Sequence, residues 1–151
     1  QVSALRALKV KRVALLTPYT EDISRMNAEM LERDAGVLVV SRLTMGLGLD
    51  ELTSRVSINS ITAWATAVNR EDVDAVLIGC SAFRACPPTG FIDDLETLLG
   101  KPVLTSTQCF LWHMLRLSGV NDTLEGYGKL LRTDPAIESV ACGFGDRILS
   151  P

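Results

Sequence analysis

Short apolar runs alternate along the chain with longer segments in which apolar residues recur every three to four positions. The runs cover residues 13–16, 37–40, 75–78 and 102–105, and their length is that of a buried β-strand. Each run is followed by a segment with helical periodicity, and one strand with its helix takes up about 30 residues. This alternation is typical of βαβ units, so we predict an α/β domain with a mainly parallel four-stranded sheet and helices on both faces.

Each predicted helix carries a stripe of apolar side chains that we expect to pack on the sheet. The helices begin after polar capping residues and end near glycines, with Gly36, Gly100 and Gly119 as the expected stops. The expected stripes consist of Ile23, Met26, Met30 and Leu31; of Ile58, Ile61, Trp64, Ala65 and Val68; of Ile92, Leu95, Leu98 and Leu99; and of Phe110, Leu111, Met114 and Leu115.

Right-handed crossovers place the carboxyl ends of all the strands at one edge of the predicted sheet. Thr17, Pro18 and Tyr19 follow the first strand there. The loop of residues 45–50 follows the second strand, and residues 80–81 and 106–108 follow the third and fourth. Ligands of open α/β sheets bind at this edge. We therefore expect the binding site among these hydroxyl groups, one thiol and one phenol, with the 45–50 loop able to move over it.

Cys80 is the reactive group that the pattern presents most directly, because Gly79, Cys80 and Ser81 stand where the third strand must stop. Residues 80–81 and 106–108 precede or open predicted helices, and the first amides of a helix favour an anion or a thiolate. The residues thus predict a small anionic ligand and a thiol reagent. A buried, unreactive cysteine is the alternative for Cys80, and on the residues alone both interpretations stay open.

Several other polar and sulfur residues have structural explanations. Cys86, Cys109 and Cys142 are interpreted as small buried side chains. His113 falls inside a predicted helix and is interpreted as a core histidine rather than a general base, so no Cys-His pair is predicted. The other residues at the strand ends also have structural alternatives. Thr17 and Pro18 could be turn residues, Tyr19 could be an aromatic at the rim, and Ser106 and Thr107 could be helix caps.

Composition and charge exclude several classes of protein. With 151 residues, of which 47% are hydrophobic, the chain can form one core, and no apolar run is long enough to span a membrane. A net charge of −3 with interspersed signs offers no basic surface for nucleic acid or for a membrane. No glycine-rich phosphate loop, Walker lysine or metal-ligand spacing occurs, so neither a cofactor nor a metal is predicted. Four cysteines without a Cys-x-x-Cys pair suit a cytoplasmic protein.

Several motifs follow one another along the chain: the Thr-Pro-Tyr segment at 17–19, the Ile-Gly-Cys-Ser strand end at 78–81, the Leu-Gly-Lys-Pro-Val segment at 99–103, and residues 106–117 and 126–131. Together they resemble the aspartate/glutamate racemase superfamily, in particular its maleate cis-trans isomerase and arylmalonate decarboxylase branch. The resemblance runs over residues 3–131. Gln1 is an unusual first residue, and the first cysteine motif of the superfamily has no counterpart here. We therefore expect the chain to be the C-terminal portion of a longer enzyme.

The resemblance implies two flavodoxin-like halves related by a pseudo-twofold axis, with the active site between them and with no cofactor or metal. This chain then contains one flavodoxin-like, three-layer α/β domain, residues 1–117, and a C-terminal extension, residues 118–151, packed on the domain or on the other half. Cys80 corresponds to the second cysteine of the superfamily and is the expected catalytic residue. The expected substrate-binding residues are Thr17, Pro18, Tyr19 and Ser81, with Tyr19 on a substrate carboxylate. Gln108 matches a family position to which no role is assigned.

The predicted function is cofactor-independent isomerisation of a small dicarboxylate, as in maleate cis-trans isomerases, by cysteine acid/base and nucleophilic chemistry. Two related alternatives use Cys80 as a proton donor, in an arylmalonate-type decarboxylase or in a racemase of an acidic amino acid. A non-catalytic flavodoxin-like binding domain is the alternative of another class. The predicted partner is a small dicarboxylate or related carboxylate, without nucleic acid or membrane. Helix faces beyond those needed for one sheet point to a homo-oligomer.

Overall fold

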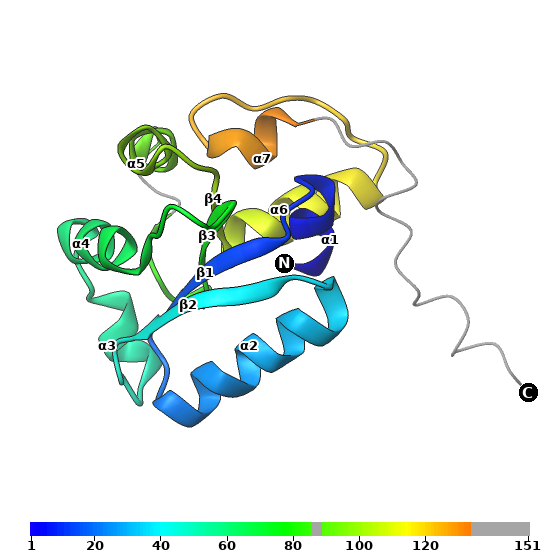
Figure 1. Ribbon diagram of the computed structural model, residues 1–151. Helices are drawn as coiled ribbons and strands as arrows, with labels where there is room; N and C mark the ends of the chain where they lie inside the picture. The colour runs from blue at the N-terminus through cyan, green and yellow to red at the C-terminus, as the bar shows by residue number, and fades with distance from the viewer. Residues whose placement is uncertain (86–88, 134–151) are drawn as a thin grey trace, which may run out of the picture.

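The computed structural model describes residues 1–85 and 89–133, and its sheet has four strands in which every pair is parallel. The strands are β1 (Arg12–Thr17), β2 (Leu38–Thr44), β3 (Ala75–Ile78) and β4 (Val103–Thr105), in the order β2-β1-β3-β4 (Figure 1). Leu16 near the end of β1 pairs with Leu43 on one side and with Ile78 on the other, and Ile78 pairs with Thr105. The strand ends are therefore level, and the predicted parallel sheet is confirmed.

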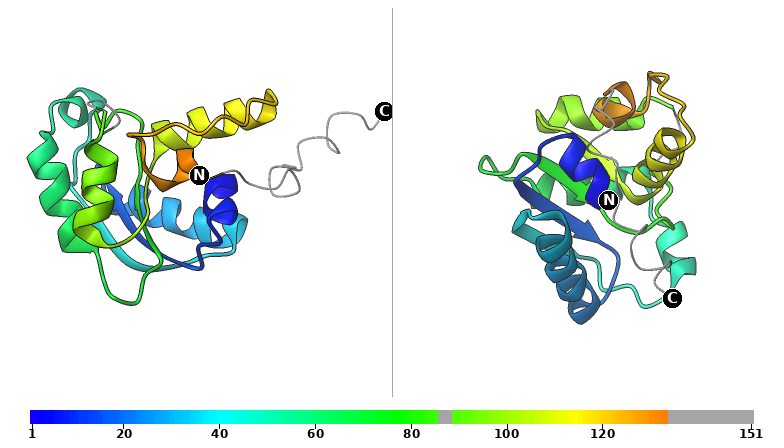
Figure 2. Two further views of the ribbon diagram at one scale, coloured as in Figure 1. Left: turned by 90° about the horizontal axis from the view of Figure 1, so that it is seen from above. Right: turned by 90° about the vertical axis from the view of Figure 1, so that its right-hand side faces the viewer.

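Helices cover both faces of this sheet. Leu15 and Leu77 point to the face that packs with α1, α2, α6 and α7, whereas Leu16 and Ile78 point to the face that packs with α4 and α5. Figures 1 and 2 show these layers. The flavodoxin-like, three-layer prediction is thus confirmed. The helices of the described residues are α1 (Val2–Ala7), α2 (Glu21–Ala35), α3 (Asp50–Ser54), α4 (Ile58–Val68), α5 (Phe91–Leu99), α6 (Ser106–Leu117) and α7 (Gly128–Arg132).

The predicted apolar stripe of α4 packs on the sheet, but the stripes of α2, α5 and α6 are wrong in part. Gly36 and Gly100 cap the C-terminal ends of α2 and α5 with positive φ angles, as predicted. The predicted stripe residues that are instead exposed are Ile23 (49%), Met26 (60%), Leu98 (61%), Phe110 (67%), Leu111 (44%) and Met114 (49%).

The N-terminal cap of α6 explains the largest of these errors. Thr105 and Gln108 form a capping box, in which the Thr105 hydroxyl accepts the Gln108 amide and the Gln108 side-chain oxygen accepts the Thr105 amide, both at 3.1 Å. Gln108 is thereby buried, and helical spacing then directs Trp112 and Arg116 to the interior instead of the predicted stripe. The buried face of α6 therefore begins at the capping Gln108 and includes Cys109 and Trp112 of the core.

Residues 118–133 return to the domain through α7. Leu130 and Leu131 of this helix are buried, with 0% and 1% of their surface exposed. Glu96 of α5 accepts hydrogen bonds from the Val103 amide at the start of β4, at 3.0 Å, and from the Lys129 amide of α7, at 2.9 Å. One carboxylate thus joins α5, β4 and α7. Residues 134–151 of the predicted extension lie outside the described residues.

Charged side chains hold the amino edge of the sheet, opposite the predicted site. Asp74 accepts hydrogen bonds from the backbone amides of Lys11 and Arg12, both at 2.8 Å, and these bonds lower the pKa of the Asp74 carboxyl. Asp72 pairs with Arg70 at 2.8 Å and with Arg12 at 2.7 Å, which lowers the pKa of Asp72 to about 2. The beginnings of β1 and β3 are therefore fixed to each other.

Candidate active site

The ends of β1 and β3 approach each other closely at the carboxyl edge of the sheet. The Gly79 amide donates to the Leu16 carbonyl at 2.8 Å, and a Cβ atom on Gly79 would lie 3.1 Å from Thr17 Cγ2, so this approach suits a glycine. Thr17 is completely buried, and its hydroxyl donates to the Ser24 hydroxyl of α2 at 2.9 Å. Thr17 therefore anchors the strand end to α2, and its contact with a substrate stays a prediction.

The loop after β2 is bound to the Thr-Pro-Tyr segment. The amides of residues 45, 46 and 47 donate to the carbonyls of Thr17, Tyr19 and Pro18, at 3.0, 3.1 and 2.7 Å respectively. The Thr44 hydroxyl also donates to the Tyr19 carbonyl. These bonds fix the first part of the 45–50 loop, which we expected to be able to move, and they hold the backbone of Tyr19 in place.

Cys80 follows β3 in a conformation that few residues other than glycine adopt. Its φ angle is +90°, in the left-handed region where a Cβ atom is crowded by the backbone. Its amide donates to the Ser106 hydroxyl oxygen at 2.9 Å, and the Ala82 amide donates to its sulfur at 3.4 Å. The residue is half-buried. The thiol is thus held by its own loop and still reachable from solvent.

Tyr19 is the ionisable side chain that the structure places next to Cys80. Burial raises the pKa of Tyr19 to about 12, with further contributions from a hydrogen bond to Cys80 and from the electrostatic effects of Cys80 and Asp50. The phenol therefore stays protonated at neutral pH and can donate a hydrogen bond to the sulfur. The structure thus brings together two predicted site residues from the ends of β1 and β3.

The first turn of α6 contacts the Cys80 loop from the side of β4. Besides the bond from the Cys80 amide to Ser106, the Thr107 hydroxyl donates to the Ser81 carbonyl at 3.5 Å. Ser81 itself is exposed. We interpreted Ser106 and Thr107 from the sequence as helix caps, and their bonds across to the neighbouring strand end were missed. Their position directly after a strand is the signal that could have indicated them.

Helix amides do not surround Cys80 in the way that the sequence suggested. Residues 81 and 82 form a turn, and α5 begins only at Phe91, so no helix starts at Cys80. The amide of Cys80 already donates to Ser106 and is not available to a ligand. For residues 106–108 the prediction is confirmed, because Ser106 opens α6. Gln108, which had no assigned role, caps this helix and donates to the Tyr127 carbonyl.

Comparison with known proteins places this strand-end site in a family. The sequence profile of the arylmalonate decarboxylase family matches residues 1–131. The chain belongs to this family. A maleate isomerase from Nocardia farcinica is 27% identical over 136 residues, which cover 90% of this chain and 53% of that protein. Arylmalonate decarboxylase from Bordetella bronchiseptica is 29% identical over 134 residues, which cover 85% of this chain and 53% of that protein.

A solved structure from the family has the same fold. It is the maleate cis-trans isomerase of Nocardia farcinica, a cysteine-to-serine mutant with a covalently bound succinylcysteine intermediate. It superimposes with a TM-score of 0.74 at 27% identity, over 88% of this chain and 53% of that one. The chain spans about half the length of the curated relatives it matches. The resemblance drawn from the sequence motifs is therefore confirmed.

Cys109 and His113 are the other predicted structural residues that the structure describes. Cys109 is buried on α6, and Cys86 and Cys142 lie outside the described residues. His113 is partly buried on the same helix, with its ring centroid 6.3 Å from that of Trp112. Among the described residues no His, Cys, Asp and Glu side chains gather in a group that could hold a metal ion. Within the same residues, no helix combines the length and apolar character that crossing a bilayer requires.

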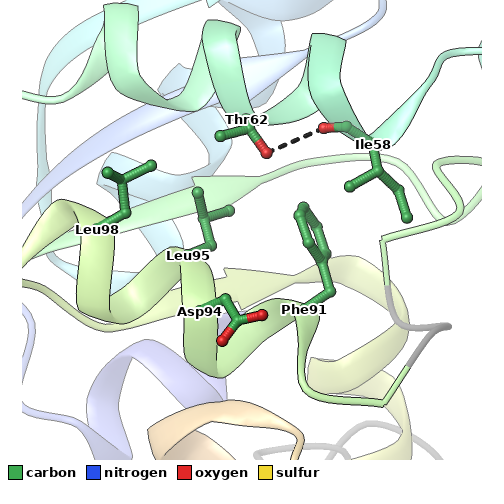
Figure 3. Close-up of a pocket in the computed structure, with 6 residues that line it drawn as sticks. All are labelled: Ile58, Thr62, Phe91, Asp94, Leu95 and Leu98. Atoms are coloured by element: carbon green, nitrogen blue, oxygen red, sulfur yellow. Dashed lines mark hydrogen bonds between the residues drawn. The ribbon is translucent and has the colours of Figure 1, made fainter.

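Cavities elsewhere on the domain do not include the strand-end site. One of about 260 Å³ is lined by residues of β2 and α4, and another of about 190 Å³ lies between α4 and α5 (Figure 3). The walls of the second cavity are mainly apolar, and the Thr62 hydroxyl within it already donates to the Ile58 carbonyl at 3.0 Å. Neither cavity is lined by Cys80 or Tyr19. The candidate site therefore rests on the residues that the strand ends bring together.

Proposed function

We propose that the protein is a cofactor-independent isomerase of a small dicarboxylate, with the conversion of maleate to fumarate as the type reaction. The observation that carries this proposal is the position of Cys80 beside Tyr19 at neighbouring strand ends in a member of this family. Maleate isomerases are among its relatives, and one of them has been seen with a succinylcysteine intermediate. Thiol chemistry on a four-carbon dicarboxylate thus has a precedent in a related protein.

In the proposed reaction, the thiolate of a second cysteine, supplied from outside this chain, adds to one alkene carbon of maleate. As the carbon–sulfur bond forms, the π electrons move to the neighbouring carbon, and the Cys80 thiol delivers its proton there. Rotation about the resulting single bond brings the carboxylates to opposite sides. Cys80 then takes a proton back from the same carbon, the carbon–sulfur bond breaks, and fumarate leaves with both sulfurs restored to their starting states.

Tyr19 and Ser81 are proposed to bind the substrate carboxylates. The pKa of Tyr19 is raised to about 12, so its hydroxyl keeps its proton at neutral pH. The hydroxyl can therefore donate a hydrogen bond to a carboxylate or to the negative charge that develops during proton transfer. Ser81 lies on the exposed side of the same loop. Thr17 and Pro18 are buried and support this arrangement through the backbone. The Cys80 amide has no part in substrate binding because Ser106 accepts its hydrogen.

Decarboxylation of an arylmalonate is the second candidate. It is favoured by the match of residues 1–131 to the arylmalonate decarboxylase family and by the 29% identity to an arylmalonate decarboxylase. In that reaction a carboxylate leaves as carbon dioxide, and the electrons of the broken carbon–carbon bond form an enediolate with the remaining carboxylate. The Cys80 thiol then supplies one proton to the α carbon, and the resulting thiolate takes a proton from water. This route requires one thiol and no second cysteine.

Proton NMR of the purified enzyme, with this chain joined to the part that supplies the second cysteine, is run with maleate and separately with phenylmalonate to test both candidates. We expect fumarate to appear from maleate, to disappear with Cys80→Ala, and to persist with Cys109→Ala. Cys109 is a suitable control because it is buried in the core cluster on the other face of the sheet. Phenylacetate formed from phenylmalonate, with maleate unchanged, would favour the second candidate. Undiminished turnover of either substrate by Cys80→Ala would contradict both.

A further inference from the structure

The backbone of Cys80 needs an external constraint. Among the described residues, Lys9 and Cys80 are the non-glycine residues with positive φ, at +56° and +90°. An L-amino acid does not favour this region by itself, because its Cβ atom meets the neighbouring carbonyl. Surrounding contacts must hold such a residue, and strained residues of this kind gather at functional sites. The φ angle of Cys80 also decides where its thiol points, so whatever fixes this angle directs the sulfur.

Among the described residues, the hydrogen bonds within the loop reach the residue before Cys80 and the Cys80 sulfur, but not the Cys80 amide. The Gly79 amide bonds the Leu16 carbonyl before it, and the Ala82 amide reaches the Cys80 sulfur after it. The bond that restrains the amide of Cys80 comes from Ser106, 26 residues further along the chain, at 2.9 Å. Together with the longer bond from the Thr107 hydroxyl to the Ser81 carbonyl, at 3.5 Å, this hydrogen bond connects the end of β3 to the start of α6, and it is the one that reaches the Cys80 amide.

Ser106 is itself held firmly enough to act as a fixed point. It follows Thr105, which pairs with Ile78 in the sheet and caps α6 together with Gln108. The Ser106 oxygen also accepts the Gln1 side-chain amide at 2.7 Å, so both of its acceptor positions are used. A serine in this place therefore offers a rigid acceptor to the amide of Cys80.

We propose that Ser106 is a positioning residue, which holds the backbone of Cys80 in its left-handed conformation and so keeps the sulfur beside Tyr19 and the Ala82 amide. Ser106 acts through the Cys80 amide and makes no contact with the reacting atoms in this role. The effect on turnover rests on the proposed function, whereas the effect on the conformation and reactivity of Cys80 does not. Without this bond, the loop relaxes and the sulfur leaves its hydrogen-bond donors.

The test compares Ser106→Ala, which removes the acceptor, with Ser106→Thr, which keeps it. Ser118→Ala, at the exposed C-terminal end of the same helix, is the control for a general effect on α6. Ser106 is not the N-cap of α6, because Thr105 has that role, so we expect both variants to fold. Circular dichroism of each variant checks this.

The first measurements do not depend on turnover. In Ser106→Ala, hydrogen exchange at the Cys80 amide should accelerate, and alkylation of Cys80 by iodoacetamide should slow by about 3- to 10-fold as the sulfur loses its donors. Ser106→Thr and Ser118→Ala should match the unmodified protein in both respects. Unchanged exchange and unchanged alkylation in a folded Ser106→Ala variant would overturn the proposal, whatever the substrate is.

Turnover of maleate gives the second measurement. We expect Ser106→Ala to lower kcat by about 10- to 100-fold while KM changes little, because the misplaced group acts in the chemical step. Ser106→Thr should restore most of kcat. A loss through KM alone would contradict a positioning role. If the unmodified enzyme, with the second cysteine present, turns over neither maleate nor phenylmalonate, the proposed function fails, and the exchange and alkylation measurements still decide the role of Ser106.

Discussion

Replacing Cys80 by glycine is expected to give a more stable protein than replacing it by alanine, which reverses the usual order of these two residues. Both substitutions remove the thiol, so they differ only in the Cβ atom. Alanine keeps that atom in the left-handed conformation at a φ angle of +90°, whereas glycine has none. The comparison therefore isolates the backbone strain at this residue from the loss of the sulfur contacts.

The magnitude follows from two opposing terms. Release of a Cβ atom from the left-handed region is worth about 1–2 kcal/mol, and the greater freedom of glycine in the unfolded chain costs about 0.5–1 kcal/mol. Roughly 0.5–1 kcal/mol remains in favour of Cys80→Gly. In a protein of 151 residues this corresponds to a rise in Tm of about 2 °C over Cys80→Ala.

Calorimetry and urea unfolding of the two variants provide the assay. Ala82→Gly is the matched control in the same turn, because Ala82 is not among the residues with positive φ, and this variant should be less stable than the unmodified protein. If Cys80→Ala is as stable as Cys80→Gly or more so, the left-handed conformation carries no strain, and the reasoning on Ser106 loses its premise.

Three further predictions concern packing and titration. Gly128→Ala should destabilise the protein by about 2–4 kcal/mol in urea unfolding, through overpacking and left-handed backbone strain together, because the added Cβ would lie 2.5 Å from Ile92 Cγ2 at a φ angle of +80°. Asp74→Asn should lower Tm at neutral pH. Because the pKa of Asp74 is lowered on folding, this loss should shrink as the pH falls below about 4. Near-ultraviolet absorbance should show one tyrosine with a pKa of about 12, which Tyr19→Phe removes. Since folding raises that pKa, the stability contribution of Tyr19 is present below pH 10 and lost as the pH rises to about 12.

Each of these predictions has its own control. Gly100→Ala, at a φ angle of +67° with no atom within 4 Å of the added Cβ, should cost only the backbone strain, and an equal loss in Gly128→Ala would contradict the crowding. A difference in Tm for Asp74→Asn that stays constant from neutral to acid pH would show that the amide bonds of the carboxylate do not depend on its charge. If the titration near pH 12 disappears in Tyr127→Phe and stays in Tyr19→Phe, the assignment of the raised pKa to Tyr19 is refuted.

The strands and the candidate residues could be predicted because their signals are local. Short apolar runs that end in Thr17-Pro18 or Ile78-Gly79 locate strand ends, and parallel strands bring those ends to one edge. The positions of Cys80 and Tyr19 at that edge follow from this rule without knowledge of any contact, whereas their expected roles come from the family resemblance. The neighbourhood of the two side chains is thus a consequence of topology alone.

Features that depend on contacts distant in sequence could not be predicted. The buried face of α6 begins at Gln108, which bonds Thr105 and Tyr127, and a polar residue facing inward is invisible to an apolar periodicity. The positive φ angle of Cys80 and its bond to Ser106 leave no signal in the residues near Cys80. Both arise only when separate strand ends are already assembled.

The hydrogen bonds and the ion pair at the amino edge of the sheet have a consequence for how this protein can change over evolutionary time. Asp72 and Asp74 join β1 and β3 at the edge that carries no site residue, so substitutions in the loops of the carboxyl edge leave these bonds intact. Substitutions at exposed residues of these loops, such as Ser81, therefore leave the contacts between β1 and β3 in place. Variation within the family is therefore expected to concentrate in the loops that follow the strands. Asp72 and Asp74, which precede β3, continue to hold β1 and β3 together when those loops change.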